Sequence, residues 1–231
     1  QLRANLLRAI SHDLRTPLTA ISGNASNLIS NASSFDEQTK LSIYNDIYND
    51  SMWLINLVEN LLSITRLEEG RMNLNFTAEL IDEVVAEAVK HVHMRQDKQK
   101  ITVVHKDEFL LAKMDTRLII QVIINILDNA IKYTPKESMI TITTEKQKDK
   151  AIISIADNGA GIPDELKERV FDMFYTGANK LADSRRSIGL GLALCKSIIS
   201  VHGGEIFVKD NVPSGAIFTF TLPIGEIKIN E

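Results

Sequence analysis

The chain has 231 residues, of which 44% are hydrophobic and 24% are charged, and its formal net charge is -4. This composition is that of a globular protein with enough apolar side chains for one large domain or two small ones, which excludes disorder as the leading interpretation. The mild acidity offers no basic stripe for a nucleic acid. The single cysteine, Cys195, excludes an internal disulfide and indicates a thiol of the core.

No apolar stretch approaches the ~18 residues of a membrane-spanning helix, and no signal segment opens the chain. We therefore expect the chain itself to be soluble. The sequence starts at Gln1 without a methionine and is already in helical register. We expect it to be part of a longer protein, in which an upstream segment can include membrane spans.

Residues 2–31 predict one long amphipathic helix. Apolar side chains recur there at steps of three or four residues and form a stripe: Leu6, Ile10, Leu14, Leu18, Ile21, Ala25 and Leu28. Pro17 interrupts the pattern. Because proline removes a backbone donor and crowds the carbonyl four residues back, we expect a bend one turn after His12.

His12 is a polar, titratable group in this helix, and Asp13 is its chain neighbour. A neutral imidazole is a good nucleophile near neutral pH, and an adjacent acid can hold the other ring nitrogen in the useful tautomer or accept its proton. A lone histidine of this kind is more often a solvent-facing residue of the helix. The rest of the chain has to decide between these interpretations.

A second helix is predicted over residues 36–68, between a polar loop at 31–36 and Gly70. Its apolar residues share one side: Ile47, Leu54, Val58 and Leu61, with Ile55 and Leu62 beside them. Two such helices in a hairpin cannot bury their wide apolar faces against each other alone. We predict a homodimer in which a second copy completes a four-helix bundle. The alternative is that the hairpin packs on the rest of its own chain.

A change of pattern near residues 70–75 marks a domain boundary, with a helical hairpin over 1–70 and a mixed α/β domain over 71–231. Strands of this second domain are predicted at 74–77, 101–105, 110–114, 139–145, 151–156, 205–209 and 215–222, and the fourth and fifth form a hairpin. Helices are predicted at 81–93, from the N-cap Asp115 to 133, at 165–174 and at 190–202.

Two glycine-containing segments of the second domain are candidates for ligand contact. Asp157, Gly159 and Gly161 follow a strand at a sharp turn, and the carboxylate of Asp157 can accept a hydrogen bond from an exocyclic amine. Gly189 and Gly191 open a helix, whose free N–H groups favour phosphate. A tight turn alone also explains such glycines. Their spacing fits neither a dinucleotide fingerprint nor a Walker loop.

Three side-chain amides lie four residues apart on the helix that ends near residue 133. Gln121, Asn125 and Asn129 therefore share one face, whereas another face is apolar: Ile124, Leu127 and Ile131. Amide oxygens suit Mg²⁺ that keeps water and binds phosphates. Lys132 can reach a phosphate, and Tyr133 can lie against a base. The alternative is an amide face that only meets solvent.

Together these segments resemble the motifs of bacterial sensor histidine kinases, in that family's order. They correspond to an H-box at residues 11–18, an N-box at 121–133, a first glycine box at 157–163, an F-box at 171–174 and a second glycine box around 189–191. The H-box sequence Ser-His-Asp-Leu-Arg-Thr-Pro-Leu and the ending Val-His-Gly-Gly are similar to those of the potassium-responsive KdpD-type sensor kinases. The resemblance implies an all-α dimeric hairpin followed by an α/β sandwich of the histidine kinase, gyrase and Hsp90 type.

The resemblance also implies a role for each matching residue. His12 would accept the phosphoryl group, with Asp13 as the orienting or proton-accepting acid, and Thr16 would help to place a water during dephosphorylation of the partner. Asn129 would be the chief Mg²⁺ ligand, with Asn125 nearby. The implied contacts to ATP are Lys132, Tyr133, Asp157, Gly159, Gly161, Ile162, Gly189, Leu190 and Gly191, and residues 175–188 would form a mobile lid.

Two departures from the family pattern change these expectations. Gln121 stands where many members carry an acid, and an amide cannot act as a base there. Ser187 stands where many carry the first glycine of the second box, which would stiffen the lid. Arg185 and Arg186 can clamp phosphates or remain solvated, and we leave them outside the predicted site.

We therefore expect the catalytic core of a histidine kinase, which uses ATP and Mg²⁺ to phosphorylate His12 and then passes the phosphoryl group to an aspartate of a response regulator. The linker at residues 67–73 would act as a hinge, and the chain would be the cytoplasmic part of a membrane-anchored bacterial sensor. Three alternatives stay open. They are a dimeric binding module without phosphotransfer, an ATPase of the gyrase and Hsp90 sort, which would lack the H-box, and an enzyme that acts mainly as a phosphatase.

Overall fold

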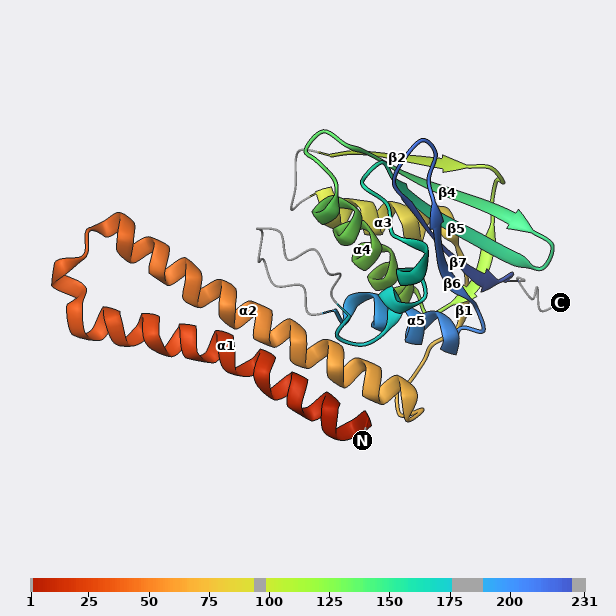
Figure 1. Ribbon diagram of the computed structural model, residues 1–231. Helices are drawn as coiled ribbons and strands as arrows, with labels where there is room; N and C mark the ends of the chain where they lie inside the picture. The colour runs from red at the N-terminus through yellow and green to blue at the C-terminus, as the bar shows by residue number, and fades with distance from the viewer. Residues whose placement is uncertain (1, 94–98, 176–188, 226–231) are drawn as a thin grey trace. The chain divides into compact units, whose positions relative to one another are not determined.

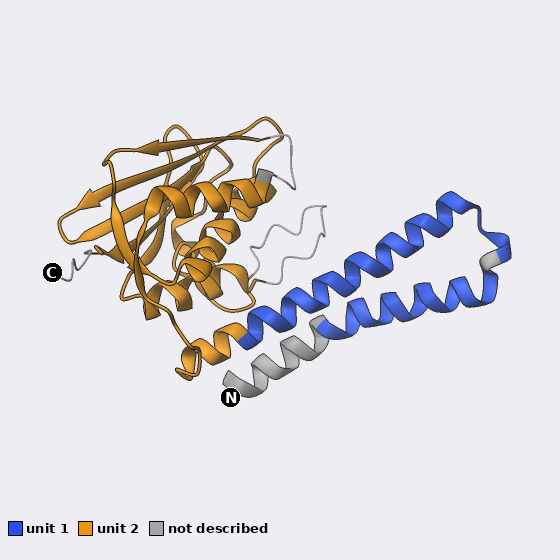
Figure 2. Ribbon diagram, turned by 180° about the vertical axis from the view of Figure 1, so that it is seen from behind, with its two compact units in different colours: residues 1–62, 183–186 blue, residues 63–182, 187–231 orange. Residues whose placement is uncertain are grey.

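The computed structural model of the chain describes residues 2–93, 99–175 and 189–225, with residues 2–13, 32 and 93 described by their backbone alone. The chain divides into two compact units (Figures 1 and 2). One consists of residues 1–62 and 183–186, and the other of residues 63–182 and 187–231. The division falls inside the second long helix, whereas the change of sequence pattern lies a few residues later.

Residues 2–68 form a hairpin of two long helices, as the apolar periodicity predicts (Figure 1). Helix α1 spans Leu2–Asn31, the 3-10 turn η1 spans Ala32–Ser34, and α2 spans Glu37–Glu68. Oδ1 of Asp36 accepts a hydrogen bond from the backbone N–H of Thr39 at 2.7 Å, which satisfies a free donor at the start of α2. Helix α1 continues through Pro17, and the bend stays a prediction.

Helix α2 carries an apolar stripe that remains exposed. Its members recur at steps of three or four residues, and each side chain is between 38% and 64% exposed: Leu41, Tyr44, Tyr48, Met52, Ile55, Val58 and Leu62. The same helix buries Leu57 and Ile64 on another side. Monomeric proteins rarely leave a contiguous apolar surface of this kind uncovered. We refer to these seven residues as the α2 stripe.

The second unit is built on a five-stranded sheet with the order β2-β4-β5-β7-β6. These strands span Lys100–His105, Met139–Gln147, Lys150–Asp157, Ala216–Pro223 and Ile206–Asp210. Strand β2 runs parallel to β4, and the other neighbours are antiparallel, including the predicted β4–β5 hairpin. A separate antiparallel pair joins β1, Thr77–Leu80, to β3, Leu111–Met114.

Three helices cover one face of the five-stranded sheet: α3, Ile81–His93; α4, Thr116–Tyr133; and α5, Gly191–Val201 (Figure 1). Alternate residues of β5 are buried, namely Ala151, Ile153 and Ile155, as expected for a strand with one covered face. Large side chains of both layers are fully buried: Ile119, Ile123, Ile126, Leu127, Ile140, Ile142, Ile153 and Phe220. Each stabilises the fold by ~1.5–3 kcal/mol relative to an exposed side chain.

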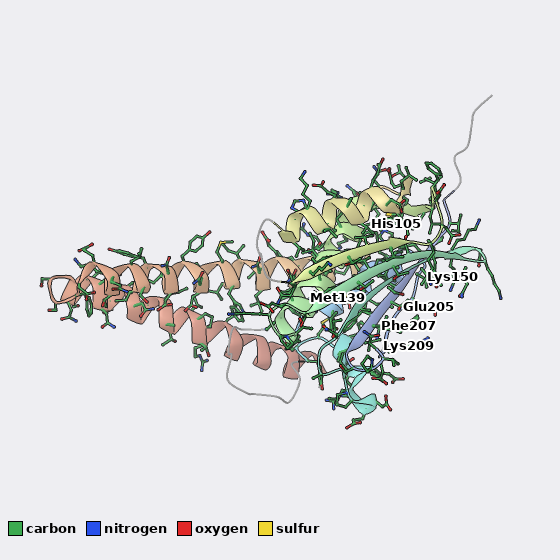
Figure 3. All side chains as sticks on the ribbon, turned by 90° about the horizontal axis from the view of Figure 1, so that it is seen from above. His105, Met139, Lys150, Glu205, Phe207 and Lys209 are labelled. Atoms are coloured by element: carbon green, nitrogen blue, oxygen red, sulfur yellow. The ribbon has the colours of Figure 1, made fainter. Side chains whose placement is uncertain are left out.

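Polar and charged groups occupy the edge of the sheet at β6 (Figure 3). Nζ of Lys150 lies 3.0 Å from Oε1 of Glu205, and Nζ of Lys209 lies 4.9 Å from the centroid of the Phe207 ring. Charged side chains along an edge strand discourage pairing with a strand of another molecule. This edge is therefore protected against uncontrolled association.

Two local predictions are wrong. Residues 74–76 are not part of a strand, because β1 begins only at Thr77, where it pairs with Met114 of β3. The single helix predicted at 165–174 is two separate 3-10 turns, η2 over Asp164–Leu166 and η3 over Arg169–Phe171. Both errors concern short segments, in which partners distant in the sequence decide the conformation.

The chain that leads into β1 is fastened to the second unit by a polar and aromatic cluster. The backbone N–H of Asn75 donates to Oδ2 of Asp115 at 3.0 Å, and the ring of Phe76 stands edge-on to that of His202 with centroids 4.9 Å apart. Nε2 of His202 in turn accepts from the backbone N–H of Asp115 at 3.0 Å. We refer to Asn75, Phe76, Asp115 and His202 as the linker clamp.

The ionisation of the linker clamp follows from these contacts. Asp115 occupies the N-cap of α4 as predicted, but its side chain makes no capping bond. Burial raises the pKa of the Asp115 carboxyl, yet hydrogen bonds from Asn75 and Arg117 outweigh this effect and lower the pKa overall. Burial lowers the pKa of His202 despite opposing effects of the Ile198 carbonyl and Asp115. The His202 ring is therefore neutral near pH 7.

Candidate functional site

The predicted amide face of α4 exists, but its side chains are half-buried rather than fully buried. Gln121, Asn125 and Asn129 lie one turn apart, while another side of α4 packs into the core. Nδ2 of Asn125 donates to the carbonyl oxygen of Gly191 at 3.4 Å. This contact connects the middle of α4 to the first residue of α5. The N-box and the second glycine box therefore meet in the folded chain.

The C-terminal end of α4 presents a cation and an aromatic ring. The side chain of Tyr133 is 60% exposed, so most of its ring is available to a ligand. Nζ of Lys132 lies 5.3 Å from the centroid of that ring, within the range of a cation–π interaction. The pair combines a flat apolar surface with a positive charge, as a base and a phosphate would require.

Asp157 is the last residue of β5, and its side chain is only 8% exposed. Oδ1 accepts from the backbone N–H of Gly159 at 2.8 Å and from that of Ala216 at 3.3 Å. Among the described residues, no hydrogen bond reaches Oδ2. The carboxylate is thus oriented through one oxygen, and the other can accept from a ligand.

Gly159 brings the Asp157 turn against the end of α4. A Cβ atom at this position would lie 3.1 Å from Cγ2 of Thr134 and 3.2 Å from the carbonyl oxygen of Tyr133. This close approach explains why residue 159 is a glycine, which the sequence pattern alone attributes to a sharp turn. It also places the turn after Asp157 next to the backbone of Tyr133, although these residues are distant in the sequence.

Gly189 joins the second glycine box to the end of the F-box. Its φ is +68°, and a Cβ would lie 2.7 Å from the carbonyl carbon of Phe174 and from the carbonyl oxygen of Tyr175. The backbone N–H of Phe174 donates to the carbonyl oxygen of Gly189 at 2.9 Å. Only glycine fits such a crossing of two backbones. The predicted lid between these points lies outside the described residues, except for Tyr175.

The remaining residues that we predicted for the nucleotide site lie in two kinds of environment. Gly161, with φ +76°, and the partly exposed Ile162 continue the turn after Asp157. Leu190 is fully buried, so a ligand can meet only its backbone. Gly191 begins α5, where the first N–H groups of the helix have no partner within the helix.

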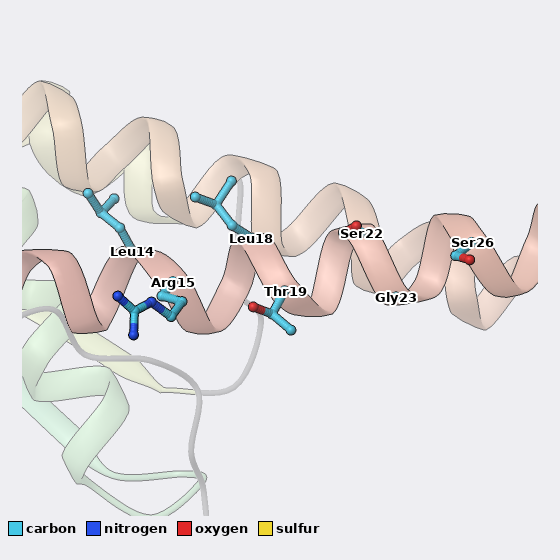
Figure 4. A pocket seen from close by; sticks show the side chains of 7 residues that line it. All are labelled: Leu14, Arg15, Leu18, Thr19, Ser22, Gly23 and Ser26. Atoms are coloured by element: carbon cyan, nitrogen blue, oxygen red, sulfur yellow. The ribbon is translucent and has the colours of Figure 1, made fainter.

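The H-box lies on α1, in the first unit. His12 and Asp13 belong to the helix, and their side chains are outside the described part of the chain. Thr16 follows one turn later and is exposed. Next to it, a shallow depression runs along the surface of α1 (Figure 4), and it is lined by mostly small or polar residues: Leu14, Arg15, Leu18, Thr19, Ser22, Gly23 and Ser26.

The sequence interpretation missed the loop that joins β6 to β7. Ala216 donates to Asp157, and the side chain of Asn211 donates through Nδ2 to the carbonyl oxygen of Asp157 at 2.7 Å. The sequence signal was Gly215, an isolated glycine at the start of a predicted strand. Such a glycine often marks a close backbone approach.

The donor types of the site favour one kind of metal. Within the described residues, no group of three or more His, Cys, Asp or Glu side chains is placed to hold an ion. The amide oxygens of Asn125 and Asn129 are hard ligands, and both side chains are partly exposed to solvent. This arrangement fits Mg²⁺, which keeps several waters and relies on substrate phosphates.

Comparisons with known proteins agree with this geometry. The family model described as "Histidine kinase-, DNA gyrase B-, and HSP90-like ATPase" matches residues 114–226, and the model "His Kinase A (phospho-acceptor) domain" matches residues 2–70. These ranges contain every predicted site residue. The fold and the site thus define an ATP-binding domain that is joined to a phospho-acceptor hairpin.

The relatives narrow this class. "Sensor protein KdpD" of Clostridium acetobutylicum is 46% identical over 96% of this chain, which spans 25% of that relative. The structure of the Acinetobacter baumannii histidine kinase AdeS matches with a TM-score of 0.75 at 28% identity, over 93% of this chain and 98% of that one. Histidine kinase ThkA, in complex with the response regulator protein TrrA, matches with a TM-score of 0.74 at 29% identity, over 95% of this chain and 61% of that one.

The chain belongs to the sensor histidine kinases, and its class is that of protein histidine kinases. Within this family it is a KdpD-like core, as the H-box and the Val-His-Gly-Gly ending predict. The predicted fold class is confirmed. The chain spans about a quarter of the length of the KdpD proteins that it matches. In the described part of the chain, none of the helices has both the length and the hydropathy of a membrane span.

Proposed function

We propose that the chain binds ATP at the α4–Asp157 site, transfers the γ-phosphoryl group to His12, and then passes it to an aspartate of a response regulator. The observation that carries this proposal is the close approach of the turn after Asp157 to the end of α4, the helix that bears Tyr133 and the amides. The two family models support it, since they match an ATPase domain and a phospho-acceptor domain in one chain.

The base of ATP would be selected by Asp157. Oδ1 is engaged by two backbone donors, so Oδ2 would accept a hydrogen bond from the exocyclic amine of adenine. The exposed ring of Tyr133 would lie against the base or the sugar. Lys132 and the backbone around Gly189, Leu190 and Gly191 would contact the phosphates.

Asn129, with Asn125 nearby, would hold Mg²⁺ through its amide oxygen. The ion, when bound, neutralises charge that develops on the phosphate oxygens during transfer. The chain contributes the orientation of these amides, and α4 is held in place by its buried face. Gln121 lies on the same face but cannot accept a proton as a carboxylate would.

At His12, the unprotonated ring nitrogen would attack the γ-phosphorus of ATP. An N–P bond forms, the bond from phosphorus to the bridging oxygen breaks, and ADP leaves with the electron pair. Asp13 would orient the ring through its other nitrogen or accept the proton of that nitrogen. A carboxylate oxygen of the response regulator would then displace the histidine, which regenerates the ring.

A phosphatase activity toward the phosphorylated regulator is a second candidate. Thr16 lies one turn after His12 and is exposed, so its hydroxyl can place a water near a phosphoaspartate docked against α1. The ThkA structure holds a response regulator protein, which supports a partner of this class. We also propose that the chain is the cytoplasmic part of a membrane-anchored sensor, since it spans only about a quarter of the sensor proteins that it matches and leaves room for further segments in the whole protein.

The test is phosphorylation of the purified chain with γ-labelled ATP and Mg²⁺. The label should be lost in acid and retained in base, as expected for a phosphoramidate, and His12→Gln should abolish it. His91→Gln, a change on the surface of α3, should incorporate label normally. Label retained on the His12 variant would refute the assignment of the acceptor.

A further inference from the structure

The loop between β6 and β7 contacts Asp157 of the candidate nucleotide site. We infer that Asn211 in this loop is a positioning residue for nucleotide recognition, which holds Asp157 in the place where it meets the base. The inference rests on the proposed function, because it assumes that Asp157 accepts from adenine. It adds a residue that acts through Asp157 and does not touch the ligand.

The amide of Asn211 is oriented by two hydrogen bonds. Oδ1 accepts from the backbone N–H of Val212 at 2.9 Å, so Nδ2 is the group that faces the carbonyl oxygen of Asp157 at 2.7 Å. The backbone N–H of Asn211 also donates to the carbonyl oxygen of Gly215 at 3.0 Å, which closes the loop. An amide with both ends engaged loses its freedom to turn.

The sheet register explains why Asp157 needs this support. Pairing of β5 with β7 ends at Ala156 and Ile217, so Asp157 lies one residue beyond the ladder on that side. Pairing of β6 with β7 ends at Asp210 and Ala216, immediately before the loop. The side chain of Asn211 therefore supplies the donor that a neighbouring strand would otherwise supply.

The same loop and the first residue of β7 contact both the backbone carbonyl and the carboxylate of Asp157. Asn211 binds its carbonyl oxygen, and the backbone N–H of Ala216 binds Oδ1 of its carboxylate. Between them lies Gly215, with φ +112°, where a Cβ would stand 2.0 Å from the carbonyl oxygen of Asp157. The loop backbone therefore lies directly on Asp157, and a shift of the loop moves the carboxylate.

The expected consequence is a loss of base selectivity that spares the phosphate contacts. Without the amide of Asn211, the carbonyl of Asp157 has no donor on the loop side, so the loop can shift and carry with it the Ala216 N–H that helps to orient the carboxylate. The preference for ATP over a nucleotide without the exocyclic amine should fall by about tenfold. This is the effect on affinity of one hydrogen bond between partly buried groups. Contacts at Lys132 and Gly191 come from other elements and should be unaffected.

The experiment compares two nucleotides with the purified full chain in Mg²⁺. ATP and purine riboside triphosphate differ only in the exocyclic amine. The Kd of purine riboside triphosphate divided by the Kd of ATP, both measured by calorimetry, therefore reports the contact of the amine with Asp157. Asn211→Ala should lower this ratio about tenfold, mainly by weakening ATP. Val212→Ala, which changes an 88% exposed side chain of the same loop, should leave the ratio unchanged.

Two further variants make the result decisive. Asn211→Asp keeps the size of the side chain but removes the donor, so it should lower the ratio as well, and it decides the question if Asn211→Ala does not fold. Asp157→Asn should lower the ratio at least as much. A ratio that stays at the wild-type value in the Asn211 variants, or a loss of equal size for both nucleotides, overturns the inference. If Asp157→Asn also leaves the ratio unchanged, the proposed base recognition itself is wrong.

Discussion

Gly189 and Gly203 share a left-handed backbone and differ in what surrounds them. Their φ angles are +68° and +72°, but a Cβ at Gly189 would collide with the backbone of Phe174 and Tyr175, whereas the nearest atom to one at Gly203 is Cγ of Pro223 at 3.9 Å. Gly203→Ala should therefore lose only the ~1–2 kcal/mol of the backbone conformation. Gly189 bears an additional steric requirement.

We predict that Gly189→Ala destabilises the second unit by more than Gly203→Ala and weakens ATP binding, because the F-box and the second glycine box must separate to admit the methyl group. Urea denaturation and nucleotide titration of both variants provide the measurement. Equal losses of stability with unchanged affinity for ATP would show that the crossing of the two backbones is not needed by the site.

His202 gives the stability of the fold a dependence on pH. Because burial holds the pKa of His202 below its ordinary value of 6.5, the unfolded chain takes up a proton first as the pH falls. The free energy of unfolding should therefore be highest above about pH 6.5 and should decrease below it. Protonation of Nε2 in the folded chain would also remove the acceptor for the N–H of Asp115.

Denaturant unfolding at pH 7 and pH 5 tests this expectation. The wild-type chain should lose stability between these values, and His202→Gln should lose less because it has no ring to protonate. His91→Gln changes a surface histidine and should behave as the wild type does. An identical pH dependence in the His202 variant would assign the effect to other groups.

Single residues of the site were predictable where their reasons are local. The four-residue spacing of Asn125 and Asn129 fixes a shared helix face, and Asp157 follows a recognisable strand. Asn211 and Ala216 were not predictable, because their bonds to Asp157 join residues 54 and 59 positions apart. Such contacts depend on the register of β5, β6 and β7, which periodicity does not give.

At the scale of elements, the exposed α2 stripe is the feature that indicates a binding partner. Seven exposed apolar side chains follow one side of α2, and a second copy of the hairpin would cover them in a four-helix bundle. The homodimer remains a prediction. A charge at the middle of the stripe should prevent it, because a buried, unpaired carboxylate is costly.

We therefore expect Ile55→Glu to elute as a monomer in size-exclusion chromatography with light scattering, where the wild-type chain elutes as a dimer. Ser42→Glu introduces the same charge at an exposed position of α2 outside the stripe, and it should remain dimeric. A dimeric Ile55→Glu protein would place the interface elsewhere.

Elements with many repeats of their pattern were predicted well, and the two wrong predictions both concern short segments. Because α1, α2 and α4 are long, their apolar period repeats over several turns. The β4–β5 hairpin shows clear alternation of apolar and polar residues. The segment at 74–77 has the same alternation over four residues, but Asn75 and Phe76 are held by Asp115 and His202 instead of by a strand. A partner outside the segment decides such cases.

At the scale of the whole chain, the structure assigns a region that the family models leave between them. Residues 71–113 lie outside both matched ranges, yet β2 pairs with β4, and β3 pairs with β1. This region therefore belongs to the second unit. The linker clamp fastens residues 75–76 to the same unit, so any hinge has to precede Asn75, which agrees with the predicted hinge at 67–73.

The burial of Cys195 makes the chain a ready subject for site-directed labelling. It is the one cysteine of the sequence, it is fully buried, and burial raises the pKa of its thiol to about 12, so it presents no thiolate to a maleimide dye at neutral pH. Cysteines introduced at the exposed positions Ile29 and Phe109, one in each unit, would then be the only reactive sites. Energy transfer between dyes placed there can test whether the distance between the two units changes when nucleotide is added, without removing any native residue of the core.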